Sequence, residues 1–407
     1  MAHAEVEPIR EANQAERMRR PTLLRLLLLL VVGTTLAAST YFPPRGEWES
    51  LPPAELGIDP EKLQAAVDFA IANETTRTRD SAEDLKGTFG KREPNYRILG
   101  PTRPHGPICG IIIHQGRVAA QWGDVDRVDM THSIAKTFLT TTVGIAWDRG
   151  IISDMHDRVG PCMPDPERFA SDHNSAITWD HLLRQTSDWS GELWGVPDWA
   201  DRPVGESTAE MRNREMHPPG THFKYNDVRV NLLALAALHV WREPLPAVLR
   251  EHVMDPIGAS ATWRWHGYKN SWIELDGLRV QSVSGGGHFG GGMFINAWDL
   301  ARFGYLFLQE GNWDGRQIVS KDWIALARTP TPVNETYGFA NWFLNTEHKM
   351  LADAPASTVT FRGNGANIIY LDWENDLVIV VRWIAGGDTL NSFVDGVLEA
   401  IAAPTNR

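Results

Sequence analysis

The most informative stretch of this chain covers residues 132–150 and reads HSIAKTFLTTTVGIAWDRG. Its apolar residues recur at helical spacing, and Gly150 follows the last of them, where a glycine typically ends a helix. Ser133 and Lys136 lie three residues apart, so one helical turn places the hydroxyl and the amine on the same face, within hydrogen-bonding reach. The stretch therefore predicts a helix that begins with a candidate nucleophile.

The predicted position of Ser133 suits nucleophilic chemistry. In the first turn of a helix the backbone N–H groups have no partner within the helix, and with the positive end of the helix dipole they favour a developing oxyanion. A serine hydroxyl is a weak nucleophile until a neighbouring base takes its proton, and Lys136 can do so only if burial or a nearby charge lowers its pKa. The spacing would also arise by chance in a chain with eight lysines. It needs support from other segments.

Two later segments supply that support. Residues 181–187 read HLLRQTS, and residues 219–227 read PGTHFKYND. With the Ser-x-x-Lys stretch before them, they resemble three ordered motifs of the superfamily that holds class C β-lactamases, D-alanyl-D-alanine carboxypeptidases and related esterases. The likeness spans roughly residues 56–402.

The resemblance implies an α+β fold of the β-lactamase and transpeptidase type. In such a fold helices flank a mostly antiparallel sheet, a helical domain is inserted between its strands, and the active site lies at the junction. The hydrolase domain would cover about residues 55–403. Its α/β part would comprise residues 55–135 and 285–403, and its helical part residues 136–284.

Local patterns along the chain fit this arrangement. Apolar runs on both sides of residues 115–116 and 374–376 predict two hairpins. Helices are predicted to start at Pro60 behind an Asp59 cap, to cover residues 226–239 and to end the domain over residues 390–402. Residues 74–107 are polar and without periodicity, which indicates a long loop.

The resemblance also assigns roles to single residues. Tyr225 would point at Ser133 and Lys136 and pass the proton to the leaving group, and either Lys136 or Tyr225 could be the base. The simpler alternative for Tyr225 is a core aromatic with a satisfied hydroxyl. The backbone N–H groups of Ser133 and Ala366 would form the oxyanion hole. Trp189 is a candidate wall of an apolar acyl pocket, with core packing as the alternative.

Asp227 departs from the family pattern, because the family usually has Asn at this position. A carboxylate near Lys136 would hold the amine protonated, and this favours Tyr225 as the base. Asp227 is therefore a candidate substrate-site residue that is also expected to affect the protonation of Lys136.

The third motif of the family, normally Lys-Thr-Gly or His-x-Gly, is best matched by Gly363, Asn364 and Gly365. These candidate substrate-binding residues lack the cation that holds a substrate carboxylate, unless Arg362 substitutes for it. We therefore expect a small-molecule or peptide-like ester or amide, hydrolysed through an acyl-enzyme. The alternatives are a β-lactamase or D-alanyl-D-alanine carboxypeptidase, and a catalytically inactive binding domain.

Composition excludes several other functions. A net charge of -12 disfavours nucleic-acid binding. Cys109 and Cys162 lack metal-site spacing, so we expect neither metal nor cofactor; a bridge between them and free cysteines are the two alternatives.

The glycines of residues 285–290 fit G-x-G-x-x-G on paper, but without a preceding strand they indicate a turn rather than a dinucleotide site. His132 and His288 could border the cleft, although structural roles are the simpler reading.

The N-terminus predicts export. Arginines precede an apolar run over residues 26–38 that is short for a membrane span, so residues 1–40 are typical of a signal peptide. If residues 22–42 stay attached they would form a membrane anchor. The expected location is periplasmic or extracellular, with contact to the membrane only through this segment.

Overall fold

The computed structural model describes residues 40–402. The predicted signal peptide or anchor therefore lies outside the described residues, apart from its end. There, the Phe42 ring packs against Tyr305 and Trp313, with centroids 5.9 and 5.5 Å away. Within residues 40–402 no single helix is long and apolar enough to span a membrane, and one bent pair, Asp227–Trp241 with Leu245–Met254, reaches that length and composition only jointly.

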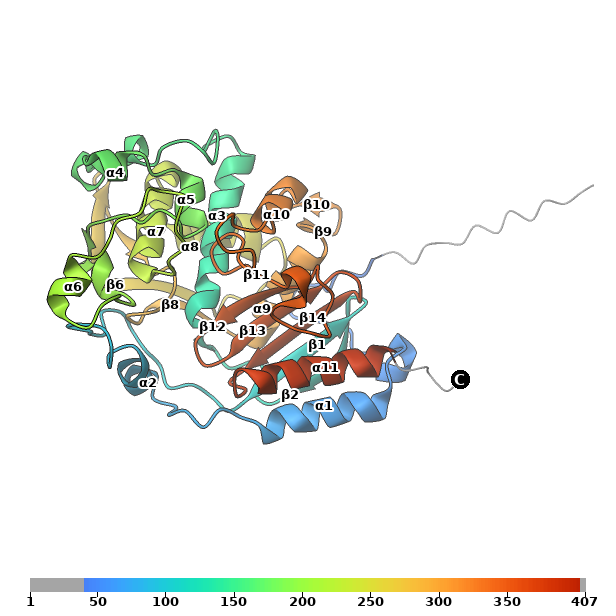
Figure 1. Ribbon diagram of the computed structural model, residues 1–407. Helices are drawn as coiled ribbons and strands as arrows, with labels where there is room; N and C mark the ends of the chain where they lie inside the picture. Colours follow the sequence, from blue (N-terminus) through green and yellow to red (C-terminus); the bar gives the residue numbers. More distant parts are fainter. Residues whose placement is uncertain (1–39, 403–407) are drawn as a thin grey trace, which may run out of the picture. The chain divides into compact units, whose positions relative to one another are not determined.

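A six-stranded antiparallel sheet is the centre of the α/β part (Figure 1). In spatial order its strands are β11 (Phe343–Leu344), β12 (Val359–Gly363), β13 (Asn367–Asp372), β14 (Leu377–Arg382), β1 (Cys109–His114) and β2 (Arg117–Trp122). Pairs β1–β2 and β13–β14 confirm the two predicted hairpins. Because β1 pairs with β14, strands far apart in the sequence lie side by side at the centre of the sheet.

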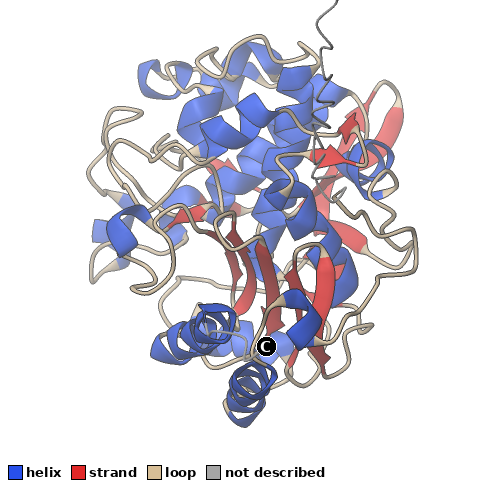
Figure 2. Ribbon diagram, turned by 90° about the vertical axis from the view of Figure 1, so that its right-hand side faces the viewer, coloured by secondary structure: helices blue, strands red, loops and turns tan. Residues whose placement is uncertain are grey.

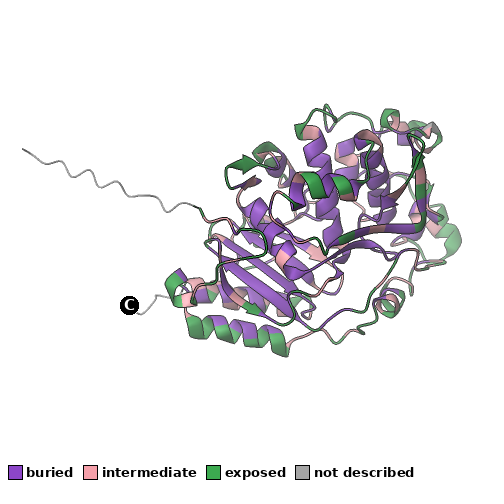
Figure 3. Ribbon diagram, turned by 180° about the vertical axis from the view of Figure 1, so that it is seen from behind, coloured by how far each residue is buried: buried purple, intermediate pink, exposed green. Residues whose placement is uncertain are grey.

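Helices cover both faces of this sheet. Helices α1 (Pro60–Ala72) and α11 (Asp388–Ala402) pack together on one face, and α9 (Ala297–Leu308) lies on the other (Figure 1). Side chains alternate between the two faces along each strand. In β14, Ile379 and Val381 accordingly join the core under α1 and α11, whereas Val378 and Val380 join the core under α9. The sheet is buried throughout its middle strands (Figure 3).

The helical part is built around two buried helices. The short 3-10 turn η2 (His132–Ile134) leads into α3 (Ala135–Asp148), which packs against α7 (Asp227–Trp241). The helices of this part gather above the sheet in Figure 2. Helices α3 and α7 are buried on nearly all sides, and their buried residues include polar ones such as Lys136 and Asp227. The predicted Asp59 cap of α1 is confirmed, since its carboxylate accepts from the N–H groups of Glu61 and Lys62.

Shorter elements complete the described chain. The remaining helices and turns are η1 (Pro53–Leu56), α2 (Ser81–Thr88), η3 (Gly160–Cys162), η4 (Pro166–Phe169), α4 (Asp172–Ser175), α5 (Trp179–Leu183), η5 (Asp198–Ala200), α6 (Thr208–Arg212), α8 (Leu245–Leu249), η6 (Arg250–Met254), α10 (Lys321–Ala327) and η7 (Thr346–His348). The remaining strands are β3 (Asp129–Met130), β4 (Glu192–Leu193), β5 (Val196–Pro197), β6 (Arg264–Leu275), β7 (Leu278–Val283), β8 (Gly292–Ile295), β9 (Asn312–Trp313) and β10 (Arg316–Gln317).

Two elements differ from the sequence predictions. The long hairpin β6–β7 lies within the part predicted to be helical, and it pairs through β8 with β3 in a second sheet. Its turn, Asp276-Gly277, is a typical hairpin dipeptide between alternating residues, so the signal was present in the sequence. Helix α2 lies within the predicted loop, where Asp80 caps it by accepting from two N–H groups.

The two cysteines are free. Cys109 is buried in β1, where burial raises the pKa of its thiol to about 11, and Cys162 is exposed in η3. Of the two alternatives, the structure therefore supports free cysteines.

Candidate active site

Ser133 and Lys136 meet as the spacing predicts. Ser133 lies in η2 and Lys136 in the first turn of α3, and the Lys136 Nζ is 2.9 Å from the Ser133 Oγ. Ser133 is partly exposed, so a substrate can reach its hydroxyl, whereas the Lys136 side chain has no exposed surface. A buried amine beside an accessible hydroxyl is the arrangement that nucleophilic catalysis by serine requires.

Asp227 binds the same amine from the opposite helix. It is the first residue of α7, and its Oδ1 lies 2.7 Å from the Lys136 Nζ with both side chains fully buried. Burial alone would raise the pKa of Asp227, but the charges of Lys136 and Arg202 hold it below its ordinary value. Asp227 is therefore an ionised partner of the lysine.

Tyr225 completes the set that the resemblance predicts. It immediately precedes Asn226, the cap of α7, and its ring lies under the Lys136 amino group with 4.7 Å between Nζ and the ring centroid. Burial and the Asp227 charge raise the pKa of the phenol above its ordinary value, and its interaction with the Ser133 hydroxyl opposes this rise only in part. The phenol is thus suited to donate a proton rather than to take one.

Burial has the opposite effect on Lys136. It lowers the pKa of the amine, and the Arg202 charge lowers it further, while Asp227 opposes both. The sequence-based argument that Asp227 keeps the amine protonated considered only the last of these influences. The argument for Tyr225 as the base is therefore weaker than the sequence suggested.

Arg202 is a site residue that sequence reasoning missed. Its Nη1 lies 2.8 Å from Asp227 Oδ2 and 2.6 Å from Asp201 Oδ1. The guanidinium carbon is 4.8 Å from the centroid of the Tyr225 ring and 5.2 Å from that of Phe89. Arg202 therefore donates a hydrogen bond to Asp227 Oδ2, the carboxylate oxygen that Lys136 does not contact.

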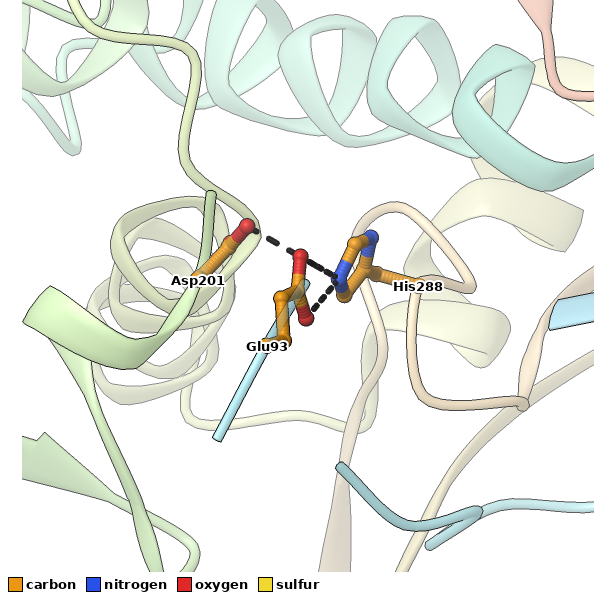
Figure 4. Close-up of side chains that lie close together, drawn as sticks. All are labelled: Glu93, Asp201 and His288. Carbon is orange, nitrogen blue, oxygen red and sulfur yellow. Dashed lines mark hydrogen bonds and ion pairs between the residues drawn. The ribbon is translucent and has the colours of Figure 1, made fainter. Parts of the chain in front are cut away.

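His288 and Glu93 continue this polar cluster (Figure 4). The Nε2 of His288 contacts both Glu93 carboxylate oxygens, at 2.7 and 2.9 Å, and its Nδ1 is 3.2 Å from Arg202 Nη2. An arginine can only donate, so Nδ1 accepts and Nε2 donates to Glu93. The contacts give His288 a structural role between the predicted loop and the site.

Glu93, Asp201 and His288 bring three metal-ligand atoms within 4.8 Å of one another. These atoms already bind one another or Arg202, and a divalent cation between them would lie against the guanidinium charge. The donor set therefore fits a metal poorly, and we assign it to the polar cluster.

The glycine-rich run packs directly on the candidate catalytic groups. A side-chain carbon on Gly286 would collide with Asp227 Oδ1 and Lys136 Nζ, so only glycine fits at this position. Gly287, the next residue, has a φ of +69°, which also favours glycine. The run allows close approach of the backbone. Contrary to the sequence-based argument, a strand does precede it, since β7 ends at Val283. The glycines are explained instead by the contact of Gly286 with the two buried side chains.

The third-motif residues form the turn between β12 and β13. Gly363 pairs with Asn367, and a side chain on Gly363 would collide with the Thr131 carbonyl, so this turn packs against the segment that carries the candidate nucleophile, Ser133. The Asn364 side chain accepts from Arg77 Nη1 at 3.0 Å and thus turns toward the segment that holds α2. Gly365 and Ala366 both have positive φ, +78° and +52°.

Arg362 is a cation with a free donor near this turn. Its Nε donates to Thr360 Oγ1 at 2.8 Å, while its buried Nη2 has no hydrogen-bond partner among residues 40–402. Burial lowers the pKa of Arg362 to about 10. The guanidinium lies 5.6 Å from the Phe343 ring, which in turn stacks on Tyr225 with centroids 6.5 Å apart.

Two further candidates have structural positions. Trp189 is 1% exposed, and its indole N–H donates to the Arg168 carbonyl at 3.0 Å, so the structure places it in the core rather than on a pocket wall. His132 is buried beside Ser133, and burial lowers its pKa to about 3. A surface hollow of about 770 Å³ lies instead beside residues 221–223 and 332–336.

Comparison with known proteins identifies the family and the fold. The sequence matches the Beta-lactamase family over residues 111–383. Among curated protein sequences none matches the chain. Solved structures of similar fold include a family VIII carboxylesterase, which is 16% identical with a TM-score of 0.56 and coverage of 87% of this chain and 99% of that one.

Two other structures show the same fold. A penicillin-binding protein homologue from Caulobacter crescentus is 15% identical with a TM-score of 0.54, over 84% of this chain and 98% of the homologue. A β-lactamase from Mycobacterium bovis is 19% identical with a TM-score of 0.52, over 73% and 95% of the two chains. The family match covers more than half of the sequence, and we conclude that this chain belongs to the Beta-lactamase family of serine hydrolases.

Proposed function

We propose that this chain hydrolyses an ester or amide through an acyl-enzyme on Ser133. The observation that carries the proposal is the line of contacts from Ser133 Oγ to Lys136 Nζ to Asp227, at 2.9 and 2.7 Å. In the proposed reaction Ser133 attacks the substrate carbonyl, and its proton passes to the amine of Lys136.

In the proposed reaction, other groups protonate the leaving group and stabilise the negative charge of the oxyanion. The phenol of Tyr225, which burial keeps protonated, would donate to the departing oxygen or nitrogen and be reprotonated through Lys136. The N–H groups of Ser133 and Ala366 would stabilise the oxyanion. Water then attacks the acyl-enzyme by the same route in reverse, which releases the acid and restores the Ser133 hydroxyl.

A substrate that carries a carboxylate is the second candidate. Arg362 supports it, because its unpartnered Nη2 offers a charge-assisted hydrogen bond close to the rings that border Tyr225. Such a substrate would resemble a β-lactam or a D-alanyl peptide. A neutral ester or amide has no group for this donor, so the two candidates are separable by experiment.

Intact mass tests both candidates on the full chain. We expect a fluorophosphonate to add one adduct to the wild type and none to Ser133→Ala, because the Lys136 amine lies within hydrogen-bonding distance of the Ser133 hydroxyl. Ser153→Ala removes an exposed serine and should react like the wild type. A labelled penicillin that also adds to Ser133 would favour the second candidate. A folded wild type that reacts with neither reagent would leave the binding-domain alternative in place.

A further inference from the structure

Asp227 poses a chemical problem for the proposed base. A buried carboxylate 2.7 Å from an amine favours the protonated amine, and a protonated lysine cannot take the proton of Ser133. The family that the sequence resembles usually has Asn at this position, and an amide accepts a hydrogen bond without a charge. Some other feature of this chain must offset the charge of Asp227.

The second oxygen of Asp227 is occupied by a fixed cation. Arg202 Nη1 lies 2.8 Å from Oδ2, while Lys136 holds Oδ1. Guanidinium stays protonated in proteins, so this side of the carboxylate is always paired. We propose that Arg202 is a positioning residue that lets Asp227 act toward Lys136 as a neutral amide would, and this rests on the proposed role of Lys136 as the base.

The guanidinium is held rigidly enough for this role. It lies between the rings of Tyr225 and Phe89, and its Nη2 donates to His288 Nδ1. Glu93 accepts from the backbone N–H of Arg202 at 3.1 Å and from His288 Nε2. The cluster therefore aims the cation at Asp227 rather than leaving it free to move to solvent.

Arg202 also interacts with Asp201, so its charge is shared. Asp201 has a second source of stabilisation, because its Oδ2 accepts from the backbone N–H groups of Asp227 and Val228 at the start of α7. The positive end of this helix offsets part of the Asp201 charge. Much of the positive charge of Arg202 is therefore available to offset the negative charge of Asp227.

The groups that face Lys136 come from four elements. Ser133 precedes it in η2, Asp227 belongs to α7, Tyr225 precedes α7, and Tyr337 lies in the segment before β11. Of the charges beyond them, Arg202 lowers the pKa of Lys136 and Asp227 raises it. Removing either charge should therefore move the titration of Lys136, in opposite directions.

Variants of Arg202 and Asp227 form a double-mutant cycle in which the two single variants should shift the pH dependence of acylation in opposite directions. In Arg202→Gln the unbalanced Asp227 should raise the pH at which acylation by fluorophosphonate becomes fast by about one unit or more. In Asp227→Asn that pH should fall, because the negative charge that raises the pKa of Lys136 is removed while Arg202 remains. In the double variant an amide stands at both positions, and the pH profile should return to within about half a unit of the wild type.

A second readout does not depend on reactivity. With only eight lysines in the chain, NMR of ¹³Cε-labelled lysine can follow the titration of Lys136, identified by its absence in Lys136→Arg. If the wild type is not acylated the proposed function fails, yet the NMR cycle still tests the effect of Arg202. Arg242→Gln, which breaks an exposed pair with Asp276, is the matched control and should shift neither readout.

The proposal is overturned if Arg202→Gln lowers the rate equally at every pH and leaves the Lys136 titration in place. That result would mean that Arg202 only supports the fold. It is also overturned if the double variant titrates like Arg202→Gln, since the charge of Asp227 would then not be what Arg202 offsets.

Discussion

At the scale of single residues, the chemistry of this site depends on which side chains pair with the Asp227 carboxylate. Lys136 and Arg202 take one oxygen each of Asp227, and both Asp227 and Lys136 are closed off from water. In such surroundings a displacement of a few tenths of an ångström changes hydrogen bonds that cannot be replaced by solvent. The backbone of Gly286 lies against this pair, so a side chain at this position would displace it.

We expect Gly286→Ala to lower the rate of acylation by roughly 100-fold or more, because the new methyl group must push Lys136 or Asp227 out of place. Gly87→Ala is the control, since a side chain in α2 at that position meets no other atom. Acylation rates by intact mass, with circular dichroism to establish folding, provide the measurement. A folded Gly286→Ala that reacts at the wild-type rate would contradict the assigned packing.

How far the sequence predicts the site differs between these residues. Ser133, Lys136 and Tyr225 belong to ordered motifs, so their meeting could be expected. Arg202 stands in a loop without a motif, 25 residues from its partner Asp227. Only the folded chain brings such a loop to the start of α7, and no local pattern encodes that contact.

At the scale of elements, the segment between α1 and β1 is more than a connection. Its helix α2 carries Asp84, which binds Arg77, and Arg77 in turn donates to Asn364 in the turn between β12 and β13. The Asn364 amide also donates to Asp84 Oδ2 at 3.3 Å. These contacts tie the segment to the third-motif turn, while Phe89 and Glu93 tie it to the polar cluster.

Asp84→Ala should loosen this tie and lower the free energy of unfolding by about 1–2 kcal/mol, because two donors lose their acceptor. Hydrogen exchange should then be faster in residues 77–93 and in the β12–β13 turn. Glu83→Ala, at the exposed neighbouring position, should leave both regions unchanged. Faster exchange confined to α2 would show that the turn does not depend on it.

Prediction of the elements succeeded where periodicity was strong. The paired apolar runs predicted β1–β2 and β13–β14, and helical periodicity predicted α1, with its Asp59 cap, and α7. Helix α2 was missed because its sequence, SAEDLKGT, has few apolar residues, and its signals are an Asp80 cap and acidic residues in the first turn. The β6–β7 hairpin was missed because the resemblance placed it in a helical domain.

At the scale of the whole molecule, the buried side chain of His132 should make the folded protein less stable in acid. Burial lowers the pKa of His132 from 6.5 to about 3, and the charges of Arg77 and Arg382 contribute to this. Between these two pH values the unfolded chain binds a proton that the folded chain does not. The free energy of unfolding should therefore fall as the pH drops from about 6.5 toward 3, by roughly 4–5 kcal/mol for this residue alone.

His132→Asn should flatten this dependence. Asn tolerates the positive φ of 51° at this position and takes up no proton. Denaturant unfolding at several pH values between 7 and 4 measures the slope, and His156→Asn, at an exposed site, is the control. An equal slope in His132→Asn and the wild type would assign the acid sensitivity to other groups.

The pairing of β1 with β14 bears on how the chain is made. Cys109 faces Arg382 across this pair, so β1 cannot gain its second neighbour until almost the entire domain has left the ribosome. At about 5–20 residues per second this takes on the order of 10–50 seconds. For that time one edge of a strand containing Ile111, Ile112 and Ile113 is unpaired and open to association with other chains. The nascent chain therefore needs protection on that edge, by a chaperone or by early packing of β1 and β2 against α1.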